Sequence, residues 1–83
     1  MRLDKFIKVA RLIKRRSVAN EACDLGRVTI NGKPAKAGKD LALGDVIGIR
    51  FGDKECYFKI KEIPAGNVSK DHSEKLYEVV EKL

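Results

Sequence analysis

The sequence predicts an α+β fold in which two short N-terminal helices pack on a small, twisted, mainly antiparallel sheet, with a short C-terminal helix. Apolar residues recur at the period of a helix in the first 25 residues. From residue 28 to about residue 63, apolar and polar residues alternate, which is the period of a strand. Near the C-terminus, helical spacing returns at Leu76, Val79, Val80 and Leu83. We therefore expect a domain with its sheet over residues 1–64, then a linker and a short helix over residues 65–83.

The first helix is expected over residues 3–14 and the second over residues 18–25. The apolar face of the first helix consists of Leu3, Phe6, Ile7, Ala10 and Ile13. Ser17 is the expected N-cap of the second helix, because its hydroxyl can accept a backbone N–H that lacks a helical partner. Gly26 is expected to end that helix, since glycine adopts the left-handed conformation that commonly follows a last turn.

Four strands are expected after Gly26. The first covers residues 28–30 and turns at Asn31-Gly32, a strong hairpin signal, into a short edge segment that contains Pro34. Two longer strands are expected over residues 46–51 and 55–63.

The C-terminal helix is expected to begin near Asp71, because Asp71 and Glu74 resemble a capping box. Residues 53–83 carry six basic and seven acidic residues. We therefore expect this half to add nothing to a positive surface, and Lys70 to be unimportant for binding an anion.

The whole net charge of +6 resides in the first sixteen residues, which hold seven basic residues and one acidic residue. These basic residues are Arg2, Lys5, Lys8, Arg11, Lys14, Arg15 and Arg16. Charge of one sign on a helix with a committed apolar face indicates a surface for a polyanion, and nucleic acid is the expected partner.

The sequence offers little for catalysis or metal binding. Cys23 and Cys56 lack the paired spacing of a zinc site, and His72 is the only histidine. Two reduced thiols are the favoured interpretation, with a disulfide as the alternative. Ser69 and His72 could form a nucleophile–base pair, but a chain this short is not expected to build the necessary pocket. No metal, cofactor or enzymatic activity is expected.

Two other partners fit the charge less well. A membrane surface would need the apolar face that a small domain requires for its core, and no apolar run is long enough to span a bilayer. A helix-turn-helix would place the second helix in the DNA major groove, yet that helix presents Asn20, Glu21 and Asp24 and no basic residue after Ser17. A structured RNA surface fits better.

Three blocks of sequence closely resemble the S4 RNA-binding domain, also called the alpha-L motif. They are RLDKFI near the N-terminus, RRSVANEACDLGRVTING after it, and LALGDVI from residue 41 to 47. The resemblance covers residues 1 to about 52. It implies the alpha-L fold, with two helices on a small sheet, and binding of structured RNA, chiefly ribosomal or transfer RNA.

The resemblance also assigns roles to residues. It implies RNA contacts at Arg2, Lys5, Arg15, Arg16 and Ser17. It implies that Asp4 positions Arg2 or the corner between the helices. Further residues would shape and charge the far edge of the binding face: Arg27, Asn31, Gly32 and Lys33.

Free-standing bacterial members of the family imply a set of partners. These proteins bind large ribosomal subunits obstructed by peptidyl-tRNA, through rRNA and tRNA, and act with an RqcH-like factor that directs alanine tailing. The resemblance thus implies a cytoplasmic, monomeric RNA-binding protein. Three alternatives stay open: a heat-shock type factor that rescues stalled large subunits, a ribosome assembly or rRNA-processing factor, and an adapter whose residues Leu76, Val79 and Val80 bind a partner helix.

Overall fold

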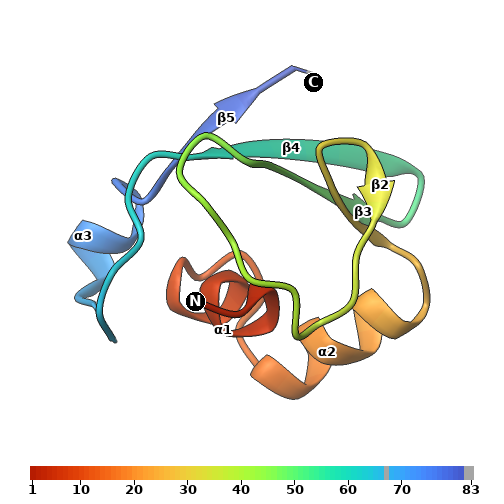
Figure 1. Cartoon of the computed structure of the whole chain (residues 1–83), viewed down its shortest axis with the longest axis horizontal. Helices are drawn as coiled ribbons and strands as arrows, with labels where there is room; N and C mark the ends of the chain where they lie inside the picture. The colour runs from red at the N-terminus through yellow and green to blue at the C-terminus, as the bar shows by residue number, and fades with distance from the viewer. Residues whose placement is uncertain (67, 82–83) are drawn as a thin grey trace.

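The computed structural model describes residues 1–66 and 68–81, and these form a five-stranded antiparallel sheet with three short helices (Figure 1). In chain order the elements are α1 (Leu3–Val9), α2 (Arg16–Asp24), β1 (Val28–Ile30), β2 (Lys33–Pro34), β3 (Val46–Phe51), β4 (Lys54–Ile60), α3 (Lys70–Ser73) and β5 (Tyr77–Val80). The strand order is β2-β1-β3-β4-β5. The predicted α+β fold class is confirmed.

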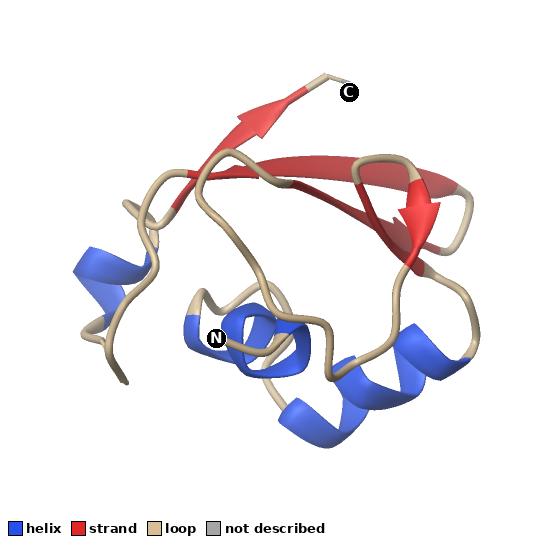
Figure 2. Cartoon of the chain, in the orientation of Figure 1, coloured by secondary structure: helices blue, strands red, loops and turns tan. Residues whose placement is uncertain are grey.

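Helices α1 and α2 lie on the same side of the sheet (Figure 2). The core between the layers is built on fully buried side chains of α1, namely Leu3, Phe6 and Ile7, and of β3, namely Ile47 and Ile49. A helix whose apolar side chains recur every three to four residues can bury one face against a sheet while its basic residues stay in solvent. This layer geometry fixes which side chains of α1 face outward.

The first helix is shorter than expected, because α1 ends at Val9 and not at residue 14. Arg11 adopts a left-handed conformation with φ of 61°. The Arg11 N–H donates to the Lys8 carbonyl, and the Leu12 N–H donates to the Ile7 carbonyl, each at 3.0 Å. This pair of bonds is the Schellman motif, which ends a helix. Ile13 matches helical spacing but reaches the core from the loop that follows.

The second helix begins at Arg16, with Arg15 as its N-cap residue, so the expected cap at Ser17 is wrong. Arg15 makes no side-chain capping hydrogen bond, and Ser17 lies exposed in the first turn. Gly26 ends α2 as expected, with φ of 74°. It occupies the same position in a second Schellman motif that Arg11 occupies in the first, since Gly26 N–H donates to Cys23 and Arg27 N–H donates to Ala22.

The central strands agree with the sequence, except that β4 covers Lys54–Ile60 rather than residues 55–63. Asn31 and Gly32 both have positive φ, 52° and 87°, as a two-residue hairpin turn requires. The short segment after the turn, β2, is an edge strand and contains Pro34.

The C-terminal region contains a short helix that begins close to the predicted start near Asp71 but ends much earlier than predicted. Helix α3 covers Lys70–Ser73, and its cap is Ser69 rather than Asp71: the Ser69 hydroxyl accepts the His72 backbone N–H at 3.2 Å. Of the residues with helical apolar spacing, Val79 and Val80 lie in β5, which pairs with β4 at Phe58↔Val79. Leu76 is buried, whereas Val79 is 67% exposed. Leu83 lies outside the described residues.

The strand forms because β4 would otherwise present an unpaired edge. Tyr77, Val79 and Val80 have side chains that favour strands, and their backbone completes hydrogen bonds that β4 offers. Spacing alone could not distinguish this arrangement from a helix. The described residues therefore do not form the helical face of Leu76, Val79 and Val80 that the adapter alternative requires.

We expect Gly26→Ala to lower the free energy of unfolding by about 1 kcal/mol, because alanine resists the left-handed conformation. A Cβ at residue 26 would meet no atom within 4 Å, so the effect is conformational and not steric. Chemical denaturation measures it. Gly66→Ala is the matched control, since that Cβ also meets nothing within 4 Å and Gly66 is not among the residues with positive φ. Equal stability of the two variants would contradict the expectation.

Candidate RNA-binding site

The carboxylate of Asp4 lies at the centre of a polar cluster between α1 and α2, although Asp4 is only 2% exposed. Arg2 donates from Nε to Oδ1 at 3.2 Å and from Nη2 to Oδ2 at 3.3 Å. Arg16 lies with Nε 3.3 Å from Oδ2 and donates from Nη2 to Oδ1 at 3.5 Å. Asn20 donates to Oδ2 at 3.4 Å, and the Lys5 backbone N–H donates to Oδ1 at 2.8 Å. We call Arg2, Asp4, Arg16 and Asn20 the Asp4 cluster.

The surroundings of Asp4 lower its pKa below the usual value. Burial alone acts in the opposite direction and raises the pKa, because it disfavours the charged form. Hydrogen bonds from Arg16 and Asn20, together with the positive charges of Arg16 and Arg2, outweigh burial. Asp4 is therefore ionised at neutral pH and holds both arginines.

Both arginines remain open to solvent while the carboxylate orients them. Their side chains are 51% exposed for Arg2 and 47% exposed for Arg16. A guanidinium has five N–H donors in a fixed plane, so the donors that Asp4 does not use can bind another anion. Such a fixed pair of guanidinium groups suits phosphate oxygens, which accept parallel hydrogen bonds.

Residues 37–41 hold the other side of Arg2. The backbone of Arg2 forms an isolated antiparallel bridge with Asp40, and Leu3 N–H donates to Lys39 at 2.8 Å. A Cβ at Gly38 would lie 3.7 Å from Nη2 of Arg2, so the guanidinium lies against this glycine. The sequence analysis missed both Gly38 and the hydrogen bond from Asn20. A glycine at the contact is a weak local signal, and nothing local pairs residue 20 with residue 4.

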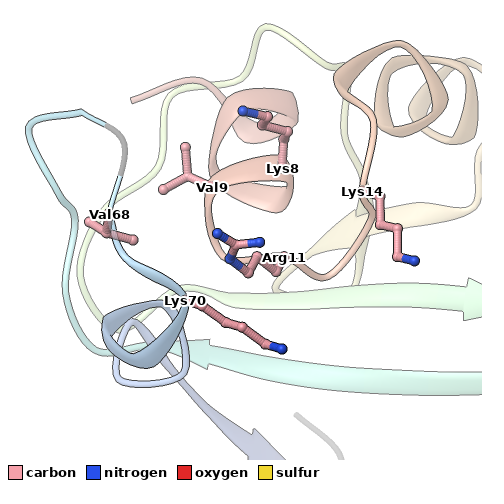
Figure 3. Close-up of a pocket in the computed structure, with 6 residues that line it drawn as sticks. All are labelled: Lys8, Val9, Arg11, Lys14, Val68 and Lys70. Carbon is pink, nitrogen blue, oxygen red and sulfur yellow. The ribbon is translucent and has the colours of Figure 1, made fainter.

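The other predicted residues fall into separate groups. Lys8, Arg11 and Lys14 line a cleft of about 660 Å³ at the far end of α1, together with Val9, Val68 and Lys70 (Figure 3). We call this the basic cleft. At the start of α2, three predicted site residues are exposed: Arg15, Arg16 and Ser17. Lys5 of α1 is half-buried.

The residues of the predicted far edge are divided between two pockets. Asn31 is engaged structurally: its Nδ2 donates to Asp45 at 3.1 Å, and its Oδ1 accepts the Val46 N–H at 3.0 Å. Lys33 lines a shallow pocket beside β2. Arg27 lies instead in a pocket with Phe51.

The cysteines and His72 take up structural positions. Cys23 and Cys56 are free, and burial, together with the negative charges of Asp4 and Asp24, raises the pKa of Cys23 to about 11. His72 Nε2 lies 2.8 Å from Glu62.

Among residues 1–66 and 68–81 there is no cluster of three or more His, Cys, Asp or Glu that could hold a metal ion. Within the same residues no helix has the length and apolar character to cross a membrane.

A half-exposed pair of arginines on a buried carboxylate, at the start of two helices that cover a small antiparallel sheet, is an anion-binding surface of the kind found in nucleic-acid-binding domains. Residues 1–47 match the S4 domain family, and the chain belongs to this family. The chain is 51% identical over 79 residues to the RQC P-site tRNA stabilizing factor of Halalkalibacterium halodurans, which covers 95% of this chain and 89% of that protein. It is 43% identical to the factor of the same name from Bacillus subtilis, over 99% of this chain and 94% of that protein. The trimeric structure of Vibrio cholerae Heat Shock Protein 15 is similar with a TM-score of 0.88 and 32% identity, over 98% of this chain and 82% of that one.

We expect Asp4→Asn to lower the free energy of unfolding by about 1–3 kcal/mol at pH 7, because two partly buried arginines lose their counter-charge. The folded-state pKa of Asp4 is lowered, so its contribution is complete above the unfolded-state pKa of about 3.9 and is lost as pH falls through the folded-state pKa. In urea denaturation, the difference between wild type and variant should therefore be constant near neutral pH and shrink as the pH falls below the unfolded-state pKa. Asp53→Asn, at an exposed turn residue, is the control. A difference that stays constant with pH would contradict this role of Asp4.

Proposed function

We propose that this protein binds large ribosomal subunits obstructed by peptidyl-tRNA and supports ribosome-associated quality control without catalysing a reaction. The Asp4 cluster carries the proposal, because it presents two oriented guanidinium groups on an S4 domain. The similarity to relatives named RQC P-site tRNA stabilizing factor supports the ribosomal context. The RNA partners are then large-subunit rRNA and the peptidyl-tRNA itself.

The contact surface is proposed to be centred on Arg2 and Arg16, with Asp4 orienting both. Residues on the same N-terminal segment extend it, and residues near β1 and β2 extend it further. The full proposed set is Arg2, Asp4, Lys5, Lys8, Arg11, Lys14, Arg15, Arg16, Ser17, Arg27, Asn31 and Lys33. Of these, Asn31 acts through its hydrogen bonds to Asp45 and Val46, which fix the hairpin turn beside Lys33.

The proposed mechanism is preferential binding of one state of the tRNA. A protein that binds one state more tightly by about 2–3 kcal/mol shifts its population roughly 30- to 150-fold. Stabilising a P-site tRNA in this way needs surface complementarity and charge, which the N-terminal segment offers, and no nucleophile. Alanine tailing would be carried out by a separate RqcH-like factor, and this protein would act as a monomer in the cytoplasm.

A heat-shock type factor is the second candidate, because the fold is also that of Vibrio cholerae Heat Shock Protein 15. Identity favours the first candidate, at 51% against 32%. Both candidates share the obstructed large subunit as target, and they differ in whether tail synthesis depends on this protein.

We expect Arg2→Ala and Arg16→Ala each to weaken binding to obstructed large subunits by about 1–3 kcal/mol and to flatten its salt dependence. Arg2→Lys should recover only part of the loss, because an ammonium group cannot form the planar, two-pronged contact. Co-sedimentation with purified subunits that carry peptidyl-tRNA measures this. Arg50→Ala removes an exposed arginine of β3 and is the control. Arginine variants that co-sediment like wild type would rule out the Asp4 cluster as the contact.

We expect reconstituted alanine tailing to fall with Arg2→Ala in proportion to lost subunit binding. Cys56→Ser and His72→Ala should support normal tailing at saturating protein, because a binding factor needs no nucleophile or base. If either variant abolished tailing while still binding subunits and melting normally, a catalytic role would replace the proposed one.

A further inference from the structure

The basic cleft joins two parts of the chain that are far apart in sequence. Lys8, Arg11 and Lys14 come from α1 and the loop after it, whereas Lys70 comes from α3 (Figure 3). Val9 and Val68 provide apolar lining. Residue 70 lies outside the segment that matches the S4 domain, so this part of the cleft is an addition to that domain.

Within the described residues, the four cations of the basic cleft have no ion-pair partner. Lys8, Arg11, Lys14 and Lys70 are exposed, and no carboxylate among residues 1–66 and 68–81 forms an ion pair with any of them. Some cations elsewhere in the described residues do have an ion-pair partner, as Lys61 has in Glu78 at 3.3 Å. Four like charges around one hollow repel each other and create a positive potential that an external anion relieves.

Arg11 indicates that this charge has a role. It holds the left-handed position of the Schellman motif that ends α1, and the equivalent position at the end of α2 is Gly26. A non-glycine residue there strains the backbone, and glycine would remove the strain. Strain that is kept in a native structure points to a function of the side chain, which here faces the basic cleft.

Lys70 is held in place by a network of hydrogen bonds. The Lys70 carbonyl accepts the Ser73 hydroxyl at 2.6 Å, and Ser73 is only 2% exposed. The Ser69 hydroxyl caps α3, and His72 contacts Glu62 at 2.8 Å. These hydrogen bonds hold the backbone of Lys70, so its side chain extends from an ordered helix.

We propose that the basic cleft binds phosphate groups of the RNA backbone, with Lys70 as a contact that the C-terminal region adds to the S4 domain. The proposal rests on the RNA binding proposed above and extends its surface to the far end of α1. RNA is favoured over an acidic peptide because Lys14 is followed directly by Arg15 and Arg16, so basic residues run along the chain from the basic cleft to the Asp4 cluster. A backbone with regularly spaced phosphates can follow such a track.

The test uses two variants of the full chain, Lys70→Ala and Arg11→Gly, and fluorescently labelled tRNA over a series of salt concentrations. Each variant should bind about 5- to 10-fold more weakly at ~0.1 M salt, with a salt slope smaller by about one. Arg11→Gly should melt at or above the wild-type temperature, because glycine relieves the strain, so its weaker binding cannot come from unfolding. Lys54→Ala is the control, since Lys54 begins β4 at the β3–β4 turn, away from α3 (Figure 1).

Unchanged affinity and salt slope in both variants would overturn the proposal, as would a wild type that does not bind labelled tRNA at low salt. So would a loss of affinity equal to that of Lys54→Ala, because it would report only total charge. Co-sedimentation with obstructed large subunits separates this result from the proposed function. If wild type fails to co-sediment but tRNA binding depends on Lys70 and Arg11, the proposed function is wrong and the basic cleft stands.

Discussion

The buried carboxylate of Asp4 is the interaction on which both N-terminal helices and their basic surface depend. A charge with 2% exposure is tolerated only if it is paired and hydrogen-bonded, and Asp4 obtains its partners from both helices and the residue before α1. The same bonds that stabilise the charge restrict the rotamers of Arg2 and Arg16. The same hydrogen bonds of Asp4 therefore both join the two helices and orient the two arginines.

The sheet contributes rigidity to this arrangement and little chemistry. Ile47 and Ile49 of β3 are buried in the same core as the apolar face of α1, so α1 cannot rotate without exposing its apolar side chains. Residues 37–41 then bind the N-terminal backbone from the other side, through the bridge between Arg2 and Asp40. Arg2 is consequently fixed at its backbone by one segment and at its guanidinium by Asp4.

Sequence patterns were sufficient where local chemistry decides the structure. The Asn31-Gly32 turn, the Gly26 helix end and the central strands follow from φ preferences and alternation, and the family resemblance placed Asp4 beside Arg2. The patterns failed where distant segments decide. Apolar spacing assigns Ile13 to the first helix, although that helix has already ended before Arg11. Apolar spacing also predicts a helix where β5 forms, because β4 has an edge that needs a partner strand. The contacts of Asn20 and Gly38 have the same non-local origin.

Charge balance in the C-terminal half shows why net charge is a poor guide to a local surface. Residues 53–83 hold almost equal numbers of acidic and basic residues, yet some acidic groups are occupied within that half: Glu78 pairs with Lys61, and Glu62 contacts His72. Lys70 is left on the side where α3 meets the end of α1, beside three further cations. At an ionic strength near 0.15 M, charges more than about 8 Å apart are largely screened, so the neutral sum over the half says nothing about the field in the basic cleft. An anion near this surface responds to the groups that the fold brings together, and here the fold gathers positive charge at the far end of α1 as well as at the Asp4 cluster.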